Sequence, residues 1–146
     1  MKVEVKIDKD VKETTVIILA NELDEDILEL ERNIASLKQD QIVGYVGYRV
    51  ASINQEDIIR TYACSGNVYI VTKEQEFKTK ETLGELEEKL DKQSFLRISR
   101  SDIINLKHVK NFDLSFTGTI SVHLVNGDTV YVSRRKLKDV KNYLGM

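Results

Sequence analysis

The sequence of 146 residues has no proline, no tryptophan, one cysteine and two histidines. A single cysteine, Cys64, excludes an intramolecular disulfide and agrees with a reducing compartment. No apolar run approaches the roughly 20 residues that a helix needs to cross a bilayer. The first residues alternate charged and apolar side chains, whereas a signal peptide has an apolar core. These absences predict a cytoplasmic protein.

Residues suited to catalysis or metal binding are also scarce. Cys64 has only His108 and His123 as candidate partners, and both histidines are isolated in the sequence. There is no glycine-rich phosphate loop, no H-E-x-x-H motif and no pair of cysteines. We therefore expect no enzyme activity, no metal site and no cofactor.

Charged residues are numerous, and they are unevenly distributed along the chain. The formal net charge of only −2 conceals this asymmetry. Residues 97–146 contain nine Lys and Arg against four Asp and Glu, whereas residues 1–96 contain thirteen against twenty. An acidic body with a basic end is the arrangement expected when one face of a protein meets phosphate.

Residues 1–45 are predicted to form a small β-β-α appendage. Lys2–Ile7 alternates apolar and charged residues, as a half-buried strand does, and the β-branched run Val16–Leu19 is expected to pair with it. A helix capped by Asp24 or Asn21 follows. Its apolar residues recur at intervals of three and four: Leu23, Ile27, Leu30, Ile34 and Leu37. This face is a candidate dimer surface, and packing onto the chain's own β-domain is its more ordinary use.

Short strands dominate from Ile42 onward, so residues 46–146 are expected to form a mostly β domain with short helices. The expected strands are 42–46, 48–53, 58–63, 68–72, 77–79, 109–114, 119–124 and 129–132, and the expected helices are 83–90 and 135–144. Ser65–Gly66–Asn67 is a turn signal. Asn126–Gly127 predicts a hairpin with a type I′ turn.

Two polar clusters interrupt this pattern. The stretch Phe95–Val109 breaks into a loop that contains Ser99, Arg100 and Ser101, and a second cluster, Ser133–Lys138, follows the last expected strand. Hydroxyl and guanidinium groups hydrogen-bond phosphates and base edges. With a third loop near Asn67, they predict one DNA-reading surface. The alternative for either cluster alone is a solvated loop of a globular domain.

Taken in order, these segments resemble the LytTR family of bacterial DNA-binding domains over roughly residues 50–146. The resemblance rests on Gly66–Asn67, Leu86–Leu90, Phe95–Ser101, Ile104–Leu106 and Val132–Arg135. It implies a β scaffold whose loops, rather than a recognition helix, enter successive major grooves on one side of the duplex.

The resemblance also implies a set of contact residues. Base edges are expected to be contacted by Asn67, Arg100 and Arg135, and the DNA backbone by Ser99, Ser101, Tyr131, Ser133, Lys136 and Lys138. For Arg97, Lys107 and Arg134, an exposed charge that steadies the loop or attracts DNA nonspecifically is at least as good a reading as direct contact with DNA. Some family members carry histidine at the position of Asn67 and asparagine at that of Arg100, so a target sequence cannot be transferred.

Many family members follow a receiver domain, and residues 1–45 are too short to form one. The chain therefore resembles the stand-alone type, and we expect a transcriptional regulator that binds double-stranded DNA as a homodimer. A membrane protein that restrains the regulator is a candidate partner, although no residue here identifies it. The alternative function is a protein-interaction or antagonist module on the same scaffold without DNA affinity, which the acidic first half favours.

Overall fold

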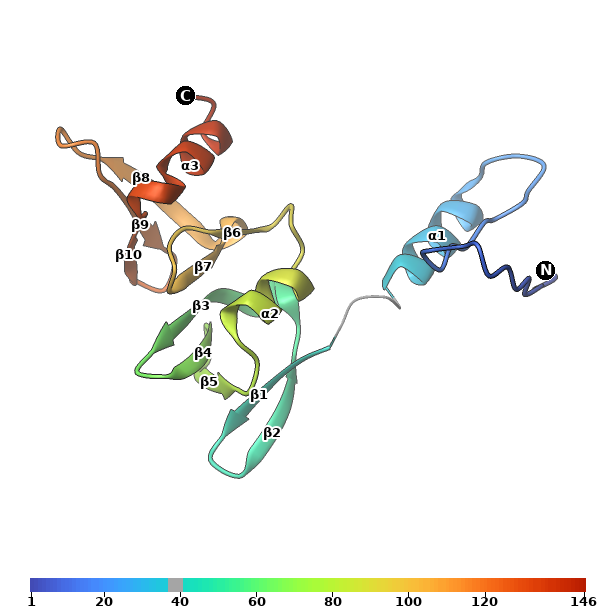
Figure 1. Cartoon of the computed structure of the whole chain (residues 1–146), viewed down its shortest axis with the longest axis horizontal. Helices are drawn as coiled ribbons and strands as arrows, with labels where there is room; N and C mark the ends of the chain where they lie inside the picture. Colours follow the sequence, from blue (N-terminus) through green and yellow to red (C-terminus); the bar gives the residue numbers. More distant parts are fainter. Residues whose placement is uncertain (37–40) are drawn as a thin grey trace. The chain divides into compact units, whose positions relative to one another are not determined.

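The computed structural model describes residues 1–36 and 41–146 (Figure 1). Contacts within the chain divide it into two compact units, Met1–Gln39 and Asp40–Met146. In the described residues, no helix is both long enough and apolar enough to cross a membrane.

Among the described residues of the first unit, the one regular element is the helix α1 (Glu25–Ser36). This confirms the expected helix, and Asp24 caps it by accepting a hydrogen bond from the Ile27 amide at 2.9 Å. The two strands expected at 2–7 and 16–19 are not formed. An isolated two-stranded hairpin is marginal in water without a further layer to cover it, and alternation alone does not supply that layer. Leu37 and the expected end of the helix near residue 38 lie outside the described residues.

The second unit is built from two antiparallel sheets, which confirms the mostly β fold with short helices. The larger sheet has the strand order β2-β1-β5-β4-β3-β7-β6, and the smaller has the order β10-β9-β8. The strands of the larger sheet are β1 (Ile42–Val46), β2 (Arg49–Ile53), β3 (Ile58–Cys64), β4 (Asn67–Thr72), β5 (Glu76–Thr79), β6 (Phe95–Arg97) and β7 (Asp102–Asn105). Those of the smaller sheet are β8 (Val109–Leu114), β9 (Ile120–Leu124) and β10 (Thr129–Tyr131). Because β1 pairs with β2 and β5, the sheet begins before residue 46.

Two helices and three single turns of 3-10 helix complete this unit. The helices are α2 (Leu83–Lys89) and α3 (Leu137–Tyr143), and the turns are η1 (Gln55–Asp57), η2 (Leu106–His108) and η3 (Arg134–Lys136). Thr82 caps α2 through a reciprocal pair of hydrogen bonds with Glu85, which confirms the expected cap. A left-handed glycine, Gly145, follows α3 with φ +77°. Helix α2 therefore begins, and helix α3 ends, where a local sequence signal places that terminus.

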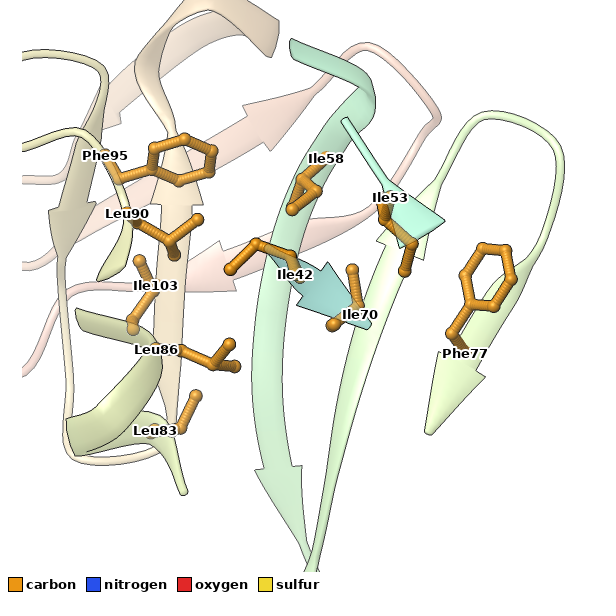
Figure 2. Packing of buried hydrophobic residues seen from close by; sticks show 10 residues of the cluster. All are labelled: Ile42, Ile53, Ile58, Ile70, Phe77, Leu83, Leu86, Leu90, Phe95 and Ile103. Atoms are coloured by element: carbon orange, nitrogen blue, oxygen red, sulfur yellow. The ribbon is translucent and has the colours of Figure 1, made fainter. Parts of the chain in front are cut away.

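Strands β3 and β7 lie between two hydrophobic cores. Ile58 and Ile103 pack into the first core with α2, whereas their neighbours Ile59 and Ile104 pack into the second core with the smaller sheet and α3. Figure 2 shows the first core, in which Leu83, Leu86 and Leu90 of the α2 segment face the strands. Successive side chains of a strand point to opposite faces, so consecutive isoleucines mark strands that are covered on both sides.

The hairpin turns differ from expectation in one respect. Ser65 and Gly66 both have positive φ, 51° and 81°, so the turn between β3 and β4 is of the type I′ class. The expected hairpin at Asn126–Gly127 is confirmed, but only Gly127 has positive φ, at 95°. Its amide donates to the Leu124 carbonyl at 3.0 Å, and the Leu124 amide donates to the Asp128 carbonyl at 2.9 Å. This is a three-residue loop with a left-handed glycine, which a local dipeptide signal does not distinguish from the two-residue turn.

Candidate nucleic-acid interface

Three polar segments meet at one edge of the second unit, and together we call them the loop edge: residues 65–67, 98–101 and 133–136. Two backbone hydrogen bonds join them. The Ala63 amide at the end of β3 donates to the Ser101 carbonyl at 2.9 Å, and the Ser133 amide donates to the Ile98 carbonyl at 2.8 Å. The middle segment is therefore bonded to the last segment and to the strand β3 that leads into the first, although about 30 residues separate the segments in the sequence.

The three residues expected to contact bases, Asn67, Arg100 and Arg135, are all exposed on this edge. Cys64 pairs with Asn67 on one side, and on its other side the strand that follows Arg100 runs beside β3. Adjacent strands are about 4.8 Å apart, so the Asn67 and Arg100 backbones are roughly 10 Å apart. None of the three side chains makes a hydrogen bond or ion pair with any described residue. Their polar tips are thus available to a ligand.

The loop that carries Arg100 is held in place by Arg97, the last residue of β6. The Arg97 guanidinium donates to the Ser99 carbonyl at 3.2 Å and to the Arg100 carbonyl at 2.7 Å. Its third contact is with a carboxylate oxygen of Glu87 on α2 at 2.8 Å. A guanidinium presents several donors in a fixed plane, so it can hold two carbonyls and a carboxylate at once. This geometry favours a role for Arg97 in steadying the loop over a role in contacting DNA.

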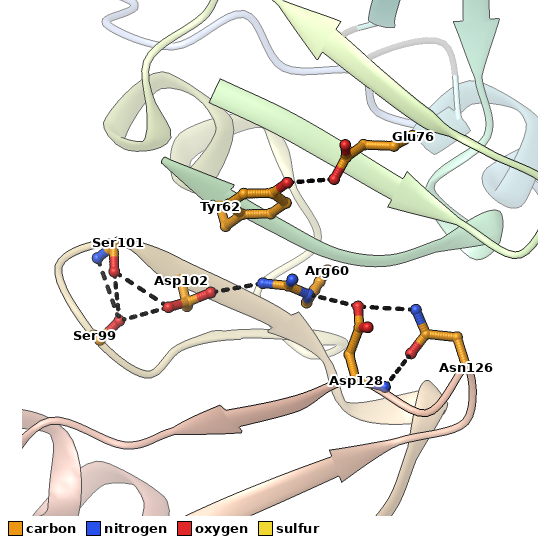
Figure 3. Close-up of polar contacts among 8 residues, drawn as sticks. All are labelled: Arg60, Tyr62, Glu76, Ser99, Ser101, Asp102, Asn126 and Asp128. Carbon is orange, nitrogen blue, oxygen red and sulfur yellow. Dashed lines mark hydrogen bonds and ion pairs between the residues drawn. The ribbon is translucent and has the colours of Figure 1, made fainter. Parts of the chain in front are cut away.

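The hydroxyls of Ser99 and Ser101 make hydrogen bonds to other groups of the same chain (Figure 3). Each donates to the same carboxylate oxygen of Asp102, at 3.3 and 3.2 Å. The Ser101 amide also donates to the Ser99 hydroxyl, at 3.2 Å. A hydroxyl has only one proton to donate, so a serine that donates to Asp102 does not donate to phosphate at the same time. Phosphate contact by either serine therefore requires an exchange of partners.

Arg60 of β3 joins this loop to the smaller sheet, as Figure 3 shows. Its guanidinium donates to Asp102 and to Asp128, each at 3.0 Å, and so bridges β7 and the β9–β10 hairpin. Burial opposes ionisation of Asp128, but hydrogen bonds from Asn126 and Arg60, together with the Arg60 charge, outweigh it and lower the pKa of Asp128. The negative charges of Asp102 and Asp128 are therefore partly neutralised by Arg60.

Arg60 also lies 4.3 Å from the centroid of the Tyr62 ring, which stacks on Tyr69 at 5.0 Å. The Tyr62 hydroxyl donates to Glu76. Burial, and then the hydrogen bond and charge of Glu76, raise the pKa of Tyr62 to about 12. Sequence reasoning missed Arg60, although a charged residue within the otherwise apolar strand Ile58–Cys64 was a usable signal. It also missed Glu87 and Asp102, whose partners are set by the fold.

The other residues expected to contact the DNA backbone lie in the last segment and next to it in the sequence. Tyr131 ends β10 and is exposed, whereas Ser133 and Lys136 are half-buried. The Lys136 ammonium lies 3.9 Å from a carboxylate oxygen of Asp139. Lys138 is exposed in the first turn of α3.

The two remaining cations have different positions. Arg134 is exposed in η3 on the loop edge, whereas Lys107 is exposed in η2, next to the β7 residue Asn105. The Asn105 amide group donates to the Ile58 carbonyl at 2.9 Å, which puts Lys107 near the start of β3 and the loop edge at its far end. A seven-residue strand is about 20 Å long. Lys107 is therefore not part of the loop edge.

The two histidines contact other parts of the scaffold rather than each other or Cys64. A ring nitrogen of His108 is 2.7 Å from the Glu56 carbonyl oxygen. The His123 ring lies between Asp113 and Thr129, at 2.5 and 3.0 Å, and so links β8, β9 and β10. Cys64 is exposed at the end of β3. In the part of the chain that the structure describes, no three His, Cys, Asp or Glu residues form a group that could hold a metal ion.

Known proteins resemble this chain over most of its length. An uncharacterized HTH-type transcriptional regulator of Staphylococcus aureus strain NCTC 8325 is 32% identical over 147 residues, which covers 100% of this chain and 99% of the relative. A regulator of the same description from strain MSSA476 is 37% identical over 109 residues, covering 75% of this chain and 74% of the relative. In the described residues of this chain, strands separate each α-helix from the next, so the fold here supplies no helix-turn-helix.

Fold and family agree with the expectation from the motifs. The solved structure of a LytTr DNA-binding domain from Bacillus cereus has a TM-score of 0.69 and 24% identity, over 73% of this chain and 97% of that chain. At that identity the likeness concerns the fold alone. The family described as the LytTr DNA-binding domain matches residues 48–145. Since this match spans more than half of the sequence and includes all three loops of the loop edge, the chain belongs to the LytTR family of DNA-binding domains.

Proposed function

We propose that this chain is a bacterial transcriptional regulator that binds double-stranded DNA sequence-specifically through the loop edge. The observation that carries the proposal is the presence on adjoining loops of three exposed side chains, Asn67, Arg100 and Arg135, that bond to no other described residue. A guanidinium binds both O6 and N7 of guanine, and an asparagine amide pairs with adenine in the major groove. Family membership and the names of the Staphylococcus relatives support the same function.

In this proposal the loops enter successive major grooves on one side of the duplex. Tyr131, Ser133, Lys136 and Lys138 would then hold the DNA backbone, which fixes the register without carrying sequence information. Ser99 and Ser101 would join them by exchanging Asp102 for phosphate. The proposed function includes no chemical reaction on the bound DNA and requires neither a metal nor a cofactor.

The proposal extends to assembly and location. We propose that the regulator acts in the cytoplasm, where its DNA is, and that it binds paired sites as a homodimer. A two-fold symmetric dimer places its half-sites one helical turn, about 10–10.5 base pairs, or a multiple of it apart. The restraining membrane protein implied by the family resemblance stays a prediction, and no described residue is assigned to it.

Selection of bound sequences from random duplex DNA, using the full chain, tests binding, specificity and spacing at once. The expected result is an enriched motif with two half-sites and an affinity that falls steeply with salt. The matched variants are Arg135→Ala on the loop edge and Lys107→Ala at the other end of β3. Arg135→Ala should relax the motif at defined positions, whereas Lys107→Ala should leave it unchanged. No enrichment from the random pool, with binding to a protein partner instead, would favour the protein-interaction module.

A further inference from the structure

The first unit leaves most of its apolar side chains in water. Val3, Val5, Ile7, Ile17 and Leu19 are between 76% and 93% exposed. Single exposed apolar residues are ordinary, but a run of them within one short segment marks an interaction surface. These exposed apolar side chains therefore form a surface that a partner outside the single chain would cover.

The alternation of charged and apolar residues before Asp8 gives this segment the two faces of a strand when its backbone is extended. The Lys2 ammonium lies 2.7 Å from a carboxylate oxygen of Glu4, so these two residues share one side of the backbone. Alternate residues share a face in an extended chain, which leaves Val3, Val5 and Ile7 on the other side. The segment forms no ladder with any described residue. An unpaired extended segment presents free N–H and C=O groups to another strand.

The sequence of this segment is complementary to itself when it is read in the opposite direction about Val5. In that antiparallel pairing, Lys2 faces Asp8 and Glu4 faces Lys6 of the other copy. Both contacts occur twice because the pairing is two-fold symmetric. On the other face Val3 meets Ile7, and Val5 meets Val5 across the axis. Opposite charges and apolar residues directly opposite one another both stabilise an antiparallel pair.

The neighbouring registers are unfavourable. Sliding one copy by two residues places Glu4 opposite Glu4 and Lys2 opposite Lys6. Sliding it by two the other way places Lys6 opposite Lys6 and Glu4 opposite Asp8. A slip by one residue would set the apolar face of one strand against the charged face of the other. One register is thus specified by charge and by pattern.

We propose that residues 2–8 of two copies of this chain pair as antiparallel strands about a two-fold axis at Val5, so that the first unit is the dimer interface. The contact is isologous, as in most homodimers. A two-stranded ribbon is marginal alone, and the run Val16–Leu19 and the apolar face of α1, from both copies, supply its cover. The inference rests on the proposed binding at paired sites for its biological role, but self-association is measured without DNA.

Charge reversal tests the register, with the dimer dissociation constant of the full chain measured by sedimentation equilibrium. Glu4→Lys or Lys6→Glu each replaces two attractive contacts with two repulsive ones. Each should raise the dissociation constant about tenfold, which corresponds to about 1.4 kcal/mol. An equimolar mixture of the two variants should form a heterodimer of wild-type strength, because every Lys then faces a Glu. The double variant Glu4→Lys, Lys6→Glu should also recover. Lys12→Glu, outside the paired segment, is the matched control and should dimerise like the wild type.

Several results would overturn the interface. These are a wild-type chain that is monomeric at every concentration, single variants that dimerise like the wild type, or a mixture without recovery. Pairing within one chain to Val16–Leu19 also predicts no recovery, because that run carries no charge. A monomer that still binds one half-site would refute the interface and leave the DNA-binding proposal standing. A dimer with the expected charge pattern but no DNA affinity would refute the proposed function instead.

Discussion

Arg97 should control DNA affinity without touching DNA, because it holds the backbone of the loop that presents Arg100. We expect Arg97→Lys to weaken binding to the preferred site although the charge is kept. An ammonium has three donors on one atom and no planar fork, so it cannot span the Ser99 carbonyl, the Arg100 carbonyl and Glu87 together. At least one loop carbonyl loses its partner, and the loop gains conformational freedom that binding must remove.

The size of the effect follows from the exposure of the three contacts. Hydrogen bonds to charged groups contribute about 1.5–3 kcal/mol each when well shielded. Arg97 is 21% exposed and Glu87 is 38% exposed, so the ion pair itself contributes about 1 kcal/mol or less. We therefore expect the Arg97→Lys variant to lose about 1–2 kcal/mol of unfolding free energy and roughly 5–30-fold in affinity. Urea unfolding and fluorescence anisotropy on the preferred duplex measure the two quantities.

The salt dependence of binding separates this positioning role from a direct phosphate contact. A positioning residue leaves the slope of log affinity against log salt unchanged, whereas loss of one phosphate contact reduces it by about 0.9. Glu87→Gln, which weakens only one of the three contacts, should have a smaller effect in the same direction. A positioning role for Arg97 is refuted if Arg97→Lys binds within twofold of wild type, or if the salt slope of the variant falls while its stability does not.

Further predictions concern the bases, the backbone and the scaffold. Arg100→Ala should cost about 1–3 kcal/mol on the preferred site and less on random DNA, and equal losses on both would exclude base reading there. Lys138→Ala should weaken binding to both and reduce the salt slope by roughly one, which a salt titration checks. Arg60→Ala should lower the unfolding free energy by roughly 2–3 kcal/mol, since it leaves Asp102 and Asp128 unpaired in a partly exposed site, and denaturant melts would show it. The raised pKa of Tyr62 means that its contribution to stability is complete below about pH 10 and is lost as pH rises toward about 12. Tyr62→Phe should remove that loss from an alkaline unfolding series.

Much of the element order could be predicted because the signals are local. Thr82 caps α2 through its own side chain, and Gly66 follows a strand whose alternation ends just before it. The same reasoning failed at Val3 and Ile7, where alternation marks a segment able to pair but not the partner that would complete the sheet. At Asn126–Gly127 the sequence pattern predicted the hairpin correctly but the type of turn incorrectly. The difference depends on loop length, which the register of β9 against β10 decides.

The candidate site divides in the same way. The chemistry of Asn67, Arg100 and Arg135 is a property of the residues, and the motifs around them were sufficient to identify the family. Their placement on one edge is a property of the fold, because it depends on backbone bonds from Ala63 to Ser101 and from Ser133 to Ile98.

The sequence by itself determined most strands of the second unit, which side chains stand at their ends and which family these motifs belong to. All of these depend on residues within a few positions of one another. Only the tertiary structure decided that Arg60 pairs with both Asp102 and Asp128, which lie 42 and 68 positions further along the chain. Only the tertiary structure decided that Arg97 holds the loop of Arg100 and forms an ion pair with Glu87. Contacts of this kind follow from which strands become neighbours, and that choice is made by the two cores that β3 and β7 share.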